Sequence, residues 1–238
     1  MKRICIVIFF ATILSCKKEA LLLPLSNKTI LSDIKDHSPV YLFFRIKNKD
    51  TLVEVNKKNT ISSTNWVFNI DKRLPLKLVI PEIKKLKEKK NKSSHKKEGA
   101  IDVFTYSDSI KKKLAFMPFT NVVYKFNNQF SRFYIVENNK VYLQFQNFSI
   151  NFNKNNEITV DGNPIERDEF VFFVNDYVPF VSQDKLALLH LNFDQNLTHN
   201  QYILNKILVN ETLSKQIKLS PIEFVYDTKK LPKCGCKL

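Results

Sequence analysis

Two stretches of this chain repeat the same order of residues at a strand-to-helix junction, and this repetition constrains the fold more than any other feature. Residues 69–75 (NIDKRLP) and 192–198 (NFDQNLT) each place an aspartate after an apolar run and lead into an amphipathic segment, 123 positions apart. Upstream, residues 40–44 (VYLFF) recur as residues 141–145 (VYLQF) at an offset of 101. A module duplicated with unequal loops accounts for both offsets, and two unrelated junctions are the alternative.

Hydrophobic periodicity predicts the elements of such a module. Helices with one apolar face are expected at residues 77–90, 166–178 and 198–213, because Pro81 limits the start of the first, Pro179 ends the second and Thr198 can cap the third. Strands are expected at residues 40–44, 66–70, 104–106, 121–126, 134–136, 141–148, 158–160, 164–165, 186–193 and 222–226. Tight turns at residues 137–140 and 161–163 would close two hairpins. The order predicts an α+β fold, with two small mixed α/β lobes related by a degenerate repeat and strand-to-helix units packed on short sheets.

The first sixteen residues have the pattern of a bacterial export signal. Lys2 and Arg3 precede an apolar run at residues 4–13 that is too short to span a bilayer, and Leu14, Ser15 and Cys16 follow. This ending resembles the lipobox of lipoprotein signals, which are cut before a cysteine that then carries acyl chains. An ordinary cleaved signal or a short anchor helix is the alternative.

These signals divide the chain into five parts. We expect a signal peptide at residues 1–15, a lipidated tether at 16–37, an N-terminal lobe at 38–127, a C-terminal lobe at 128–230 and a C-x-C tail at 231–238. Lipidation at Cys16 implies a membrane partner through the anchor, on the periplasmic side of a Gram-negative envelope. Lys17, which is not the aspartate associated with inner-membrane retention, implies the outer membrane.

The charge of the chain does not by itself point to nucleic acid. There are 38 basic and 23 acidic residues, but 33 of the basic residues are lysine and asparagine is abundant, as expected from an AT-rich genome. An exported lipoprotein also does not meet chromosomal DNA, so we expect no nucleic-acid partner. A dense basic segment could contact anionic headgroups beside the anchor, with a solvated helix face as the alternative; its residues are Lys84, Lys85, Lys87, Lys89, Lys90 and Lys92.

Cysteines offer one further candidate site. Cys234 and Cys236 form a C-x-C pair that could be a local disulfide, a link to a partner, an inert tail, or a soft-metal or redox site. His190 and His199 could complete a zinc site, although nothing in the spacing requires it. We expect no metal.

Each amphipathic helix is preceded by a strand, an aspartate, two further residues, an apolar residue, and then Pro or Thr. This order resembles the periplasmic domain of the ExbD/TolR family. The resemblance extends through the hairpin at 158–162 and the helix and strand segments at 167–178, 186–194 and 198–213. Motor activity in that family needs an uncleaved membrane helix carrying a carboxylate, and residues 4–13 have none. The resemblance therefore implies only a binding role toward envelope proteins or peptidoglycan. Asp71 and Asp194 are expected to cap the helices that follow them.

No motif in the chain predicts catalysis. There is no G-x-S-x-G or H-E-x-x-H, and three glycines cannot build a phosphate loop. We therefore expect no enzyme activity, no cofactor and no small-molecule substrate. The sequence favours a non-catalytic binding or scaffolding lipoprotein. A periplasmic thiol-redox or chaperone-like factor using Cys234 and Cys236 is the alternative, and an envelope hydrolase is a third class.

Overall fold

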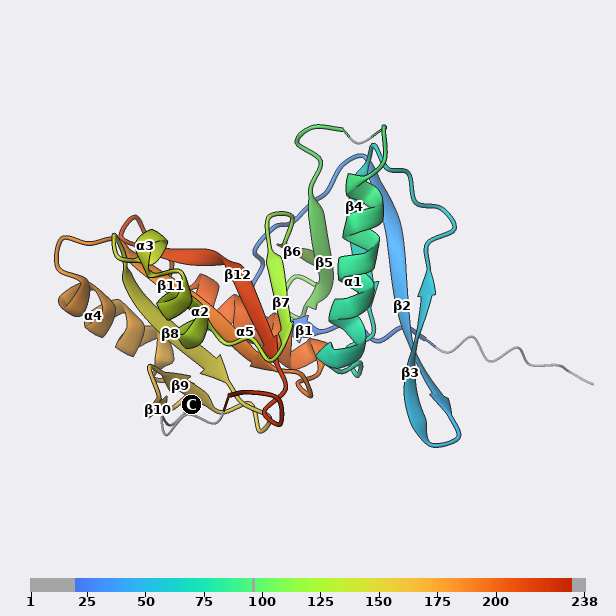
Figure 1. Ribbon diagram of the computed structural model, residues 1–238. Coiled ribbons are helices and arrows are strands. Elements are labelled where there is room, and N and C mark those ends of the chain that lie inside the picture. Colours follow the sequence, from blue (N-terminus) through green and yellow to red (C-terminus); the bar gives the residue numbers. More distant parts are fainter. Residues whose placement is uncertain (1–19, 96, 233–238) are drawn as a thin grey trace, which may run out of the picture.

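The computed structural model describes residues 20–95 and 97–232, which form two mixed sheets and five helices (Figure 1). In the first sheet the order is β1-β5-β4-β2-β3 with β6 paired to β5, and in the second it is β10-β9-β8-β11-β12-β7. The strands of the first sheet are β1 (Leu25–Ser26), β2 (His37–Lys47), β3 (Asp50–Asn56), β4 (Asn65–Ile70), β5 (Asp102–Asp108) and β6 (Lys113–Pro118). Those of the second are β7 (Val123–Asn127), β8 (Gln146–Phe152), β9 (Ile158–Val160), β10 (Asn163–Ile165), β11 (Ala187–Asp194) and β12 (Ile217–Tyr226). The helices are α1 (Leu76–Asn91), α2 (Ser131–Glu137), α3 (Asn139–Tyr142), α4 (Phe170–Ser182) and α5 (His199–Asn210).

The predicted α+β fold in two lobes is confirmed, and the two sheets repeat one topology. Five strands in the order β3-β2-β4-β5-β1 correspond to β9-β8-β11-β12-β7, with the same parallel and antiparallel pairings. In both lobes a parallel β-α-β unit, β4-α1-β5 or β11-α5-β12, follows a hairpin. The second lobe adds α2, α3, α4 and β10, and the first adds β6.

The junctions carry the repeat at the level of single hydrogen bonds. Leu76 N–H donates to the carbonyl of Leu197 at 2.9 Å, and its counterpart 123 positions on, His199 N–H, donates to the carbonyl of Leu74 at 2.7 Å. In a second matched pair, Lys77 N–H donates to the carbonyl of Gln195 and Asn200 N–H donates to the carbonyl of Lys72. A β-bridge also joins Pro75 to Thr198. Each hydrogen bond from the first junction to the second has a counterpart in the reverse direction. The starts of α1 and α5 are therefore related by a local, approximate twofold symmetry.

The register of the sheets corrects the second offset. Val40 pairs with Phe68, and Ile150 pairs with Leu191, the counterpart of Phe68. Ile150 is therefore the counterpart of Val40, and residues 141–145, which end α3 and lead to β8, do not repeat β2. The likeness of VYLFF to VYLQF was misleading because a run of aromatic and β-branched residues fits many environments.

A single hydrophobic core joins the two lobes. It includes Val79, Ile80 and Ile83 of α1 as well as Ile203 and Ile207 of α5, all almost fully buried. These positions recur at helical spacing, and Thr198 begins α5 with a capping box in which Gln201 is the reciprocal partner. The capping expected of Thr198 is confirmed.

Several elements differ from the sequence prediction. The strand at 134–136 and the turn at 137–140 are instead the short helices α2 and α3, and α4 continues through Pro179 to Ser182. Strands β3 and β6 were not predicted. The turn at Asp161 and Gly162 is confirmed, since both have positive φ between β9 and β10.

The ends of the lobes also lie elsewhere than predicted. Strand β7 was assigned to the first lobe but pairs with β12 of the second sheet, and β1, placed in the tether, pairs with β5 of the first. Ile34 of the same segment is buried against Val67 and Val103. Residues 25–37 are therefore part of the folded body. No helix among the described residues is long and apolar enough to cross a membrane.

Candidate functional site

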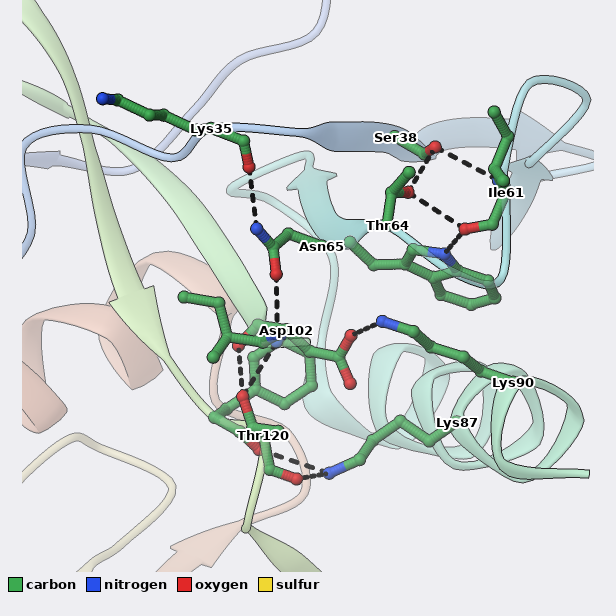
Figure 2. Close-up of polar contacts among 12 residues, drawn as sticks. Lys35, Ser38, Ile61, Thr64, Asn65, Lys87, Lys90, Asp102 and Thr120 are labelled. Carbon is green, nitrogen blue, oxygen red and sulfur yellow. Dashed lines mark hydrogen bonds and ion pairs between the residues drawn. The ribbon is translucent and has the colours of Figure 1, made fainter. Parts of the chain in front are cut away.

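The basic segment on α1 does not form one uniform surface. Lys84, Lys85, Lys89 and Lys92 are exposed. Lys90, however, is 3% exposed, forms a 2.6 Å ion pair with Asp102 and lies over the Trp66 ring (Figure 2). Lys87 donates to the carbonyl groups of Phe119, Thr120 and Val122 at 2.8–3.2 Å, and burial lowers its pKa. The assignment of Lys87 and Lys90 to an anionic contact is therefore wrong, because both ammonium groups hold α1 to β5 and the loop after β6.

The predicted cysteine sites, Cys16, Cys234 and Cys236, lie outside the described residues. His190 and His199 are buried in different surroundings, with His190 hydrogen-bonded to Asn147 and His199 between the rings of Phe104 and Tyr202. Within residues 20–95 and 97–232 no group of three His, Cys, Asp or Glu side chains is arranged to hold a metal.

A polar pocket of about 410 Å³ opens at the edge of the second sheet where the parallel strands β8, β11 and β12 end. Open α/β sheets bind ligands at this edge, and a pocket of this size suits a small molecule. The floor is built by four side chains, one from each of β8, β9, β11 and β12: Asn151, Thr159, Asp194 and Tyr226. The rim is formed by Asn153, Lys154, Asn196, Asp227, Thr228 and Lys229. We call this site the carboxyl-edge pocket.

Two polar atoms in the floor have no hydrogen-bond partner within the part of the chain that the structure describes. Asn151 is 5% exposed, and its Oδ1 finds no hydrogen-bond partner among the described residues, as is also true of Thr159 Oγ1. Burial raises the pKa of the Tyr226 hydroxyl well above its usual range, and the charge of Asp194 acts in the same direction. Buried polar atoms without partners are uncommon in native proteins and cost about 1–3 kcal/mol each, so their concentration in a pocket indicates a place for a ligand or water.

Asp194 lies in the same floor, and comparison with its counterpart in the first lobe shows that it lacks an arginine partner among the described residues. Its counterpart Asp71 forms a two-pronged ion pair with Arg73 at 2.7–2.8 Å. Burial alone would raise the pKa of Asp71, but the hydrogen bonds and charge of Arg73 hold it below the usual value. In the second lobe the position of Arg73 is taken by Asn196.

The hydrogen bonds that Asp194 accepts from described residues come only from neutral groups. They are donated by Asn196 N–H at 2.8 Å, Asn196 Nδ2 at 2.9 Å and Thr228 Oγ1 at 3.0 Å. Asp194 is 2% exposed, and no described residue forms an ion pair with it. The capping expected of both aspartates is wrong, because α1 follows Pro75 with no side-chain cap and α5 is capped by Thr198. Each aspartate instead accepts a hydrogen bond from the N–H two residues on, in the turn before the helix.

A second cluster of ionisable groups is closed to solvent. Lys206 of α5 pairs with Glu223 of β12, which also accepts a 2.6 Å hydrogen bond from Tyr202, and Tyr202 contacts Tyr124 at 3.1 Å. Glu223 and Tyr202 are fully buried. The four side chains satisfy one another, so this cluster holds β12, α5 and β7 together.

A larger open groove of about 830 Å³ lies between the two sheets, beside Phe119 and Pro221. None of its described lining side chains carries a buried polar atom without a partner. The carboxyl-edge pocket is therefore the better candidate.

Sequence reasoning found Asp194 but missed the pocket around it. The available signal was the difference between Arg73 and Asn196 inside an otherwise repeated motif. Asn151, Thr159 and Tyr226 could not be found in this way because their convergence depends on the order of strands in the sheet.

No protein-family model matches this chain, and no curated protein or solved structure is significantly similar to it.

Proposed function

We propose that this protein is a non-catalytic binding module of the bacterial envelope, held at the outer membrane through acyl chains on Cys16. The observation that carries the binding role is the carboxyl-edge pocket, whose floor presents unpartnered atoms of Asn151 and Thr159 beside Asp194. Its occupant would be a part of an envelope protein or of peptidoglycan. The resemblance to the ExbD/TolR periplasmic domain supports this choice of partners.

A binding role agrees with the chemistry of the pocket. Asp194 accepts three hydrogen bonds that fix its carboxylate in the turn. Such fixed groups suit recognition, because a rigid, preorganised site loses little conformational freedom when a ligand binds. The exposed lysines Lys84, Lys85, Lys89 and Lys92 can support the anchor by facing anionic headgroups.

Site-specific photocrosslinking in cells tests this proposal. A photoreactive residue at Asn153 on the pocket rim should give adducts with an envelope protein or a peptidoglycan fragment, whereas the same residue at Lys58, exposed on the loop after β3, should not. Identical adducts at both positions, or none at the rim, would contradict a binding role for the pocket. A labelled fatty acid fed to the cells should be incorporated into the wild-type chain and not into the Cys16→Ser variant, and a wild-type chain without label would contradict the lipid anchor.

A further inference from the structure

The repeat identifies what kind of group the carboxyl-edge pocket accepts. In the first lobe a cation, the Arg73 guanidinium, sits on the buried carboxylate of Asp71. In the second lobe the carboxylate is equally buried, the turn is the same, and the cation is missing among the described residues. An ionised carboxylate held in a buried site without a counter-charge is unfavourable, so the site favours any cation that can reach it.

We infer that the pocket binds the protonated amine of an amino-acid or dipeptide-sized zwitterion. The amine would lie against Asp194, where the first lobe has Arg73, and would donate a second hydrogen bond to the unpartnered Oδ1 of Asn151. An ammonium group has three donors and no acceptor, so it can bond the Asp194 carboxylate and the unpartnered Asn151 Oδ1 at the same time. This inference rests on the proposed binding role and narrows it to one chemical class.

The rim supplies the complementary charge. Lys154 and Lys229 line the pocket and are both exposed, at the end of β8 and after β12. They would repel a simple cation but can pair with the carboxylate of a ligand whose amine is inside. The Thr159 hydroxyl is free to bond a peptide group between the two ends. The volume of about 410 Å³ accommodates one or two residues.

Titration calorimetry of the purified full-length chain with three probes tests the inference. Alanyl-alanine should bind, its N-acetyl derivative should bind about tenfold more weakly or worse because the amine is lost, and its C-terminal amide should lose less because Lys154 and Lys229 are exposed. Equal affinities for the free and N-acetylated dipeptide, or no binding of either, would overturn the inference. Probes with D-alanine separate a peptidoglycan-like ligand from a protein end.

Two variants locate the binding on Asp194. N196R gives the second lobe the arginine of the first, so it should abolish dipeptide binding while raising the melting temperature. D194N should also abolish binding, and if it fails to fold, N196R decides alone. The matched control is R73N in the first lobe, which should lower the melting temperature and leave dipeptide binding unchanged. Undiminished binding in a folded N196R protein would overturn the assignment.

The outcomes separate this inference from the broader proposal. If rim crosslinks to envelope components persist in N196R while dipeptide binding is absent in the wild-type chain, the pocket binds a partner of another class, and only the amine assignment fails. If neither is observed, both fail. Dipeptide binding that appears only after removal of residues 233–238 would assign the pocket to a lysine of that segment, and would overturn a free zwitterion as the occupant.

Discussion

At the scale of single residues, the second lobe carries polar groups at three buried positions where the first carries apolar ones. His199 corresponds to Leu76, and Lys206 and Glu223 correspond to Ile83 and Phe104 through the helix offset and the strand register. His199 is fully buried, and neither ring nitrogen finds a partner among the described residues. Each of these differences therefore suggests a substitution in the second lobe, to the apolar residue that the first lobe carries at the corresponding position.

His199 should make the protein sensitive to acid. Burial lowers its pKa to about 3, against the opposing charge of Asp71, and burial lowers the pKa of His190 to about 4. Below pH ~6.5 the unfolded chain binds protons that the folded chain excludes, so the free energy of unfolding falls by up to ~1.4 kcal/mol per pH unit for each histidine. This loss continues down to the folded pKa of each.

H199L should therefore reduce the slope of stability against pH between about 6 and 4. It should also stabilise the protein at pH 7 by about 1–3 kcal/mol, because two unpartnered nitrogens leave the core. Urea denaturation at several pH values measures both effects. Replacing the exposed His95 by Gln is the control and should leave the slope unchanged. An unaltered slope in H199L would show that the acid sensitivity has another source.

Lys206 and Glu223 should behave as a coupled pair. K206M leaves a fully buried carboxylate without its cation and should destabilise the protein by about 3–5 kcal/mol. The double variant K206M/E223L approaches the apolar pair of the first lobe and should recover most of that loss, since buried ion pairs are often replaceable by apolar residues. A double-mutant cycle in urea measures the coupling, and additive losses would contradict it.

At the scale of elements, α2 is held by a buried amide rather than by its own sequence. Asn192 accepts from Ser131 N–H at 2.7 Å and donates to Ser131 Oγ, Ser149 Oγ and the Ile150 carbonyl. The helix has only seven residues and no side-chain cap, too few to be stable alone. The tertiary contact therefore decides its conformation.

N192A should release α2 while leaving the rest of the fold in place. The amides of Ser131–Glu137 should exchange with solvent much faster than in the wild-type chain, because the helix loses its attachment to β11. The repeat supplies the control, since the counterpart Asn69 donates only a 3.3 Å bond to Val67 and N69A should leave exchange in α2 unchanged. Equal protection in N192A would mean that packing alone holds the helix.

The same residues explain what the sequence could and could not predict. The junctions around Asp71 and Asp194 were correctly paired because their turn is local, with each aspartate bonding the N–H two residues on. Residues 134–136 were assigned to a strand because Tyr, Ile and Val favour strands, and the overriding contact with Asn192 is 61 positions away. Strand β3 was missed, although Asn48 and Lys49 with positive φ form its tight turn.

The carboxyl-edge pocket could not be predicted from the sequence because it depends on the order of strands in the sheet. Asn151 and Tyr226 meet because β11 lies between β8 and β12 in the sheet, and no local pattern encodes that order. The pairing of Lys87 with backbone carbonyls was hidden for the same reason, since a lysine on a helix has the same sequence pattern whether it faces solvent or a neighbouring loop. Only the contrast of Arg73 with Asn196 was visible beforehand.

At the scale of the whole molecule, the lobes should unfold together. Four backbone bonds join the two junctions around the bridge from Pro75 to Thr198, and one core contains both α1 and α5. Neither lobe can lose its helix without exposing the other's apolar surface. This favours a single cooperative transition rather than two independent ones.

Trp66, the single tryptophan, provides the measurement because it lies in β4 of the first lobe. Its fluorescence should report the same urea midpoint as far-ultraviolet circular dichroism, which samples both lobes. K206M alters only the second lobe, yet it should shift the Trp66 midpoint as far as the dichroism midpoint, because the shared core transmits the loss. If the Trp66 midpoint stays at its wild-type value while dichroism falls earlier, the lobes unfold separately, and the matched bonds at Pro75 and Thr198 join two independent domains.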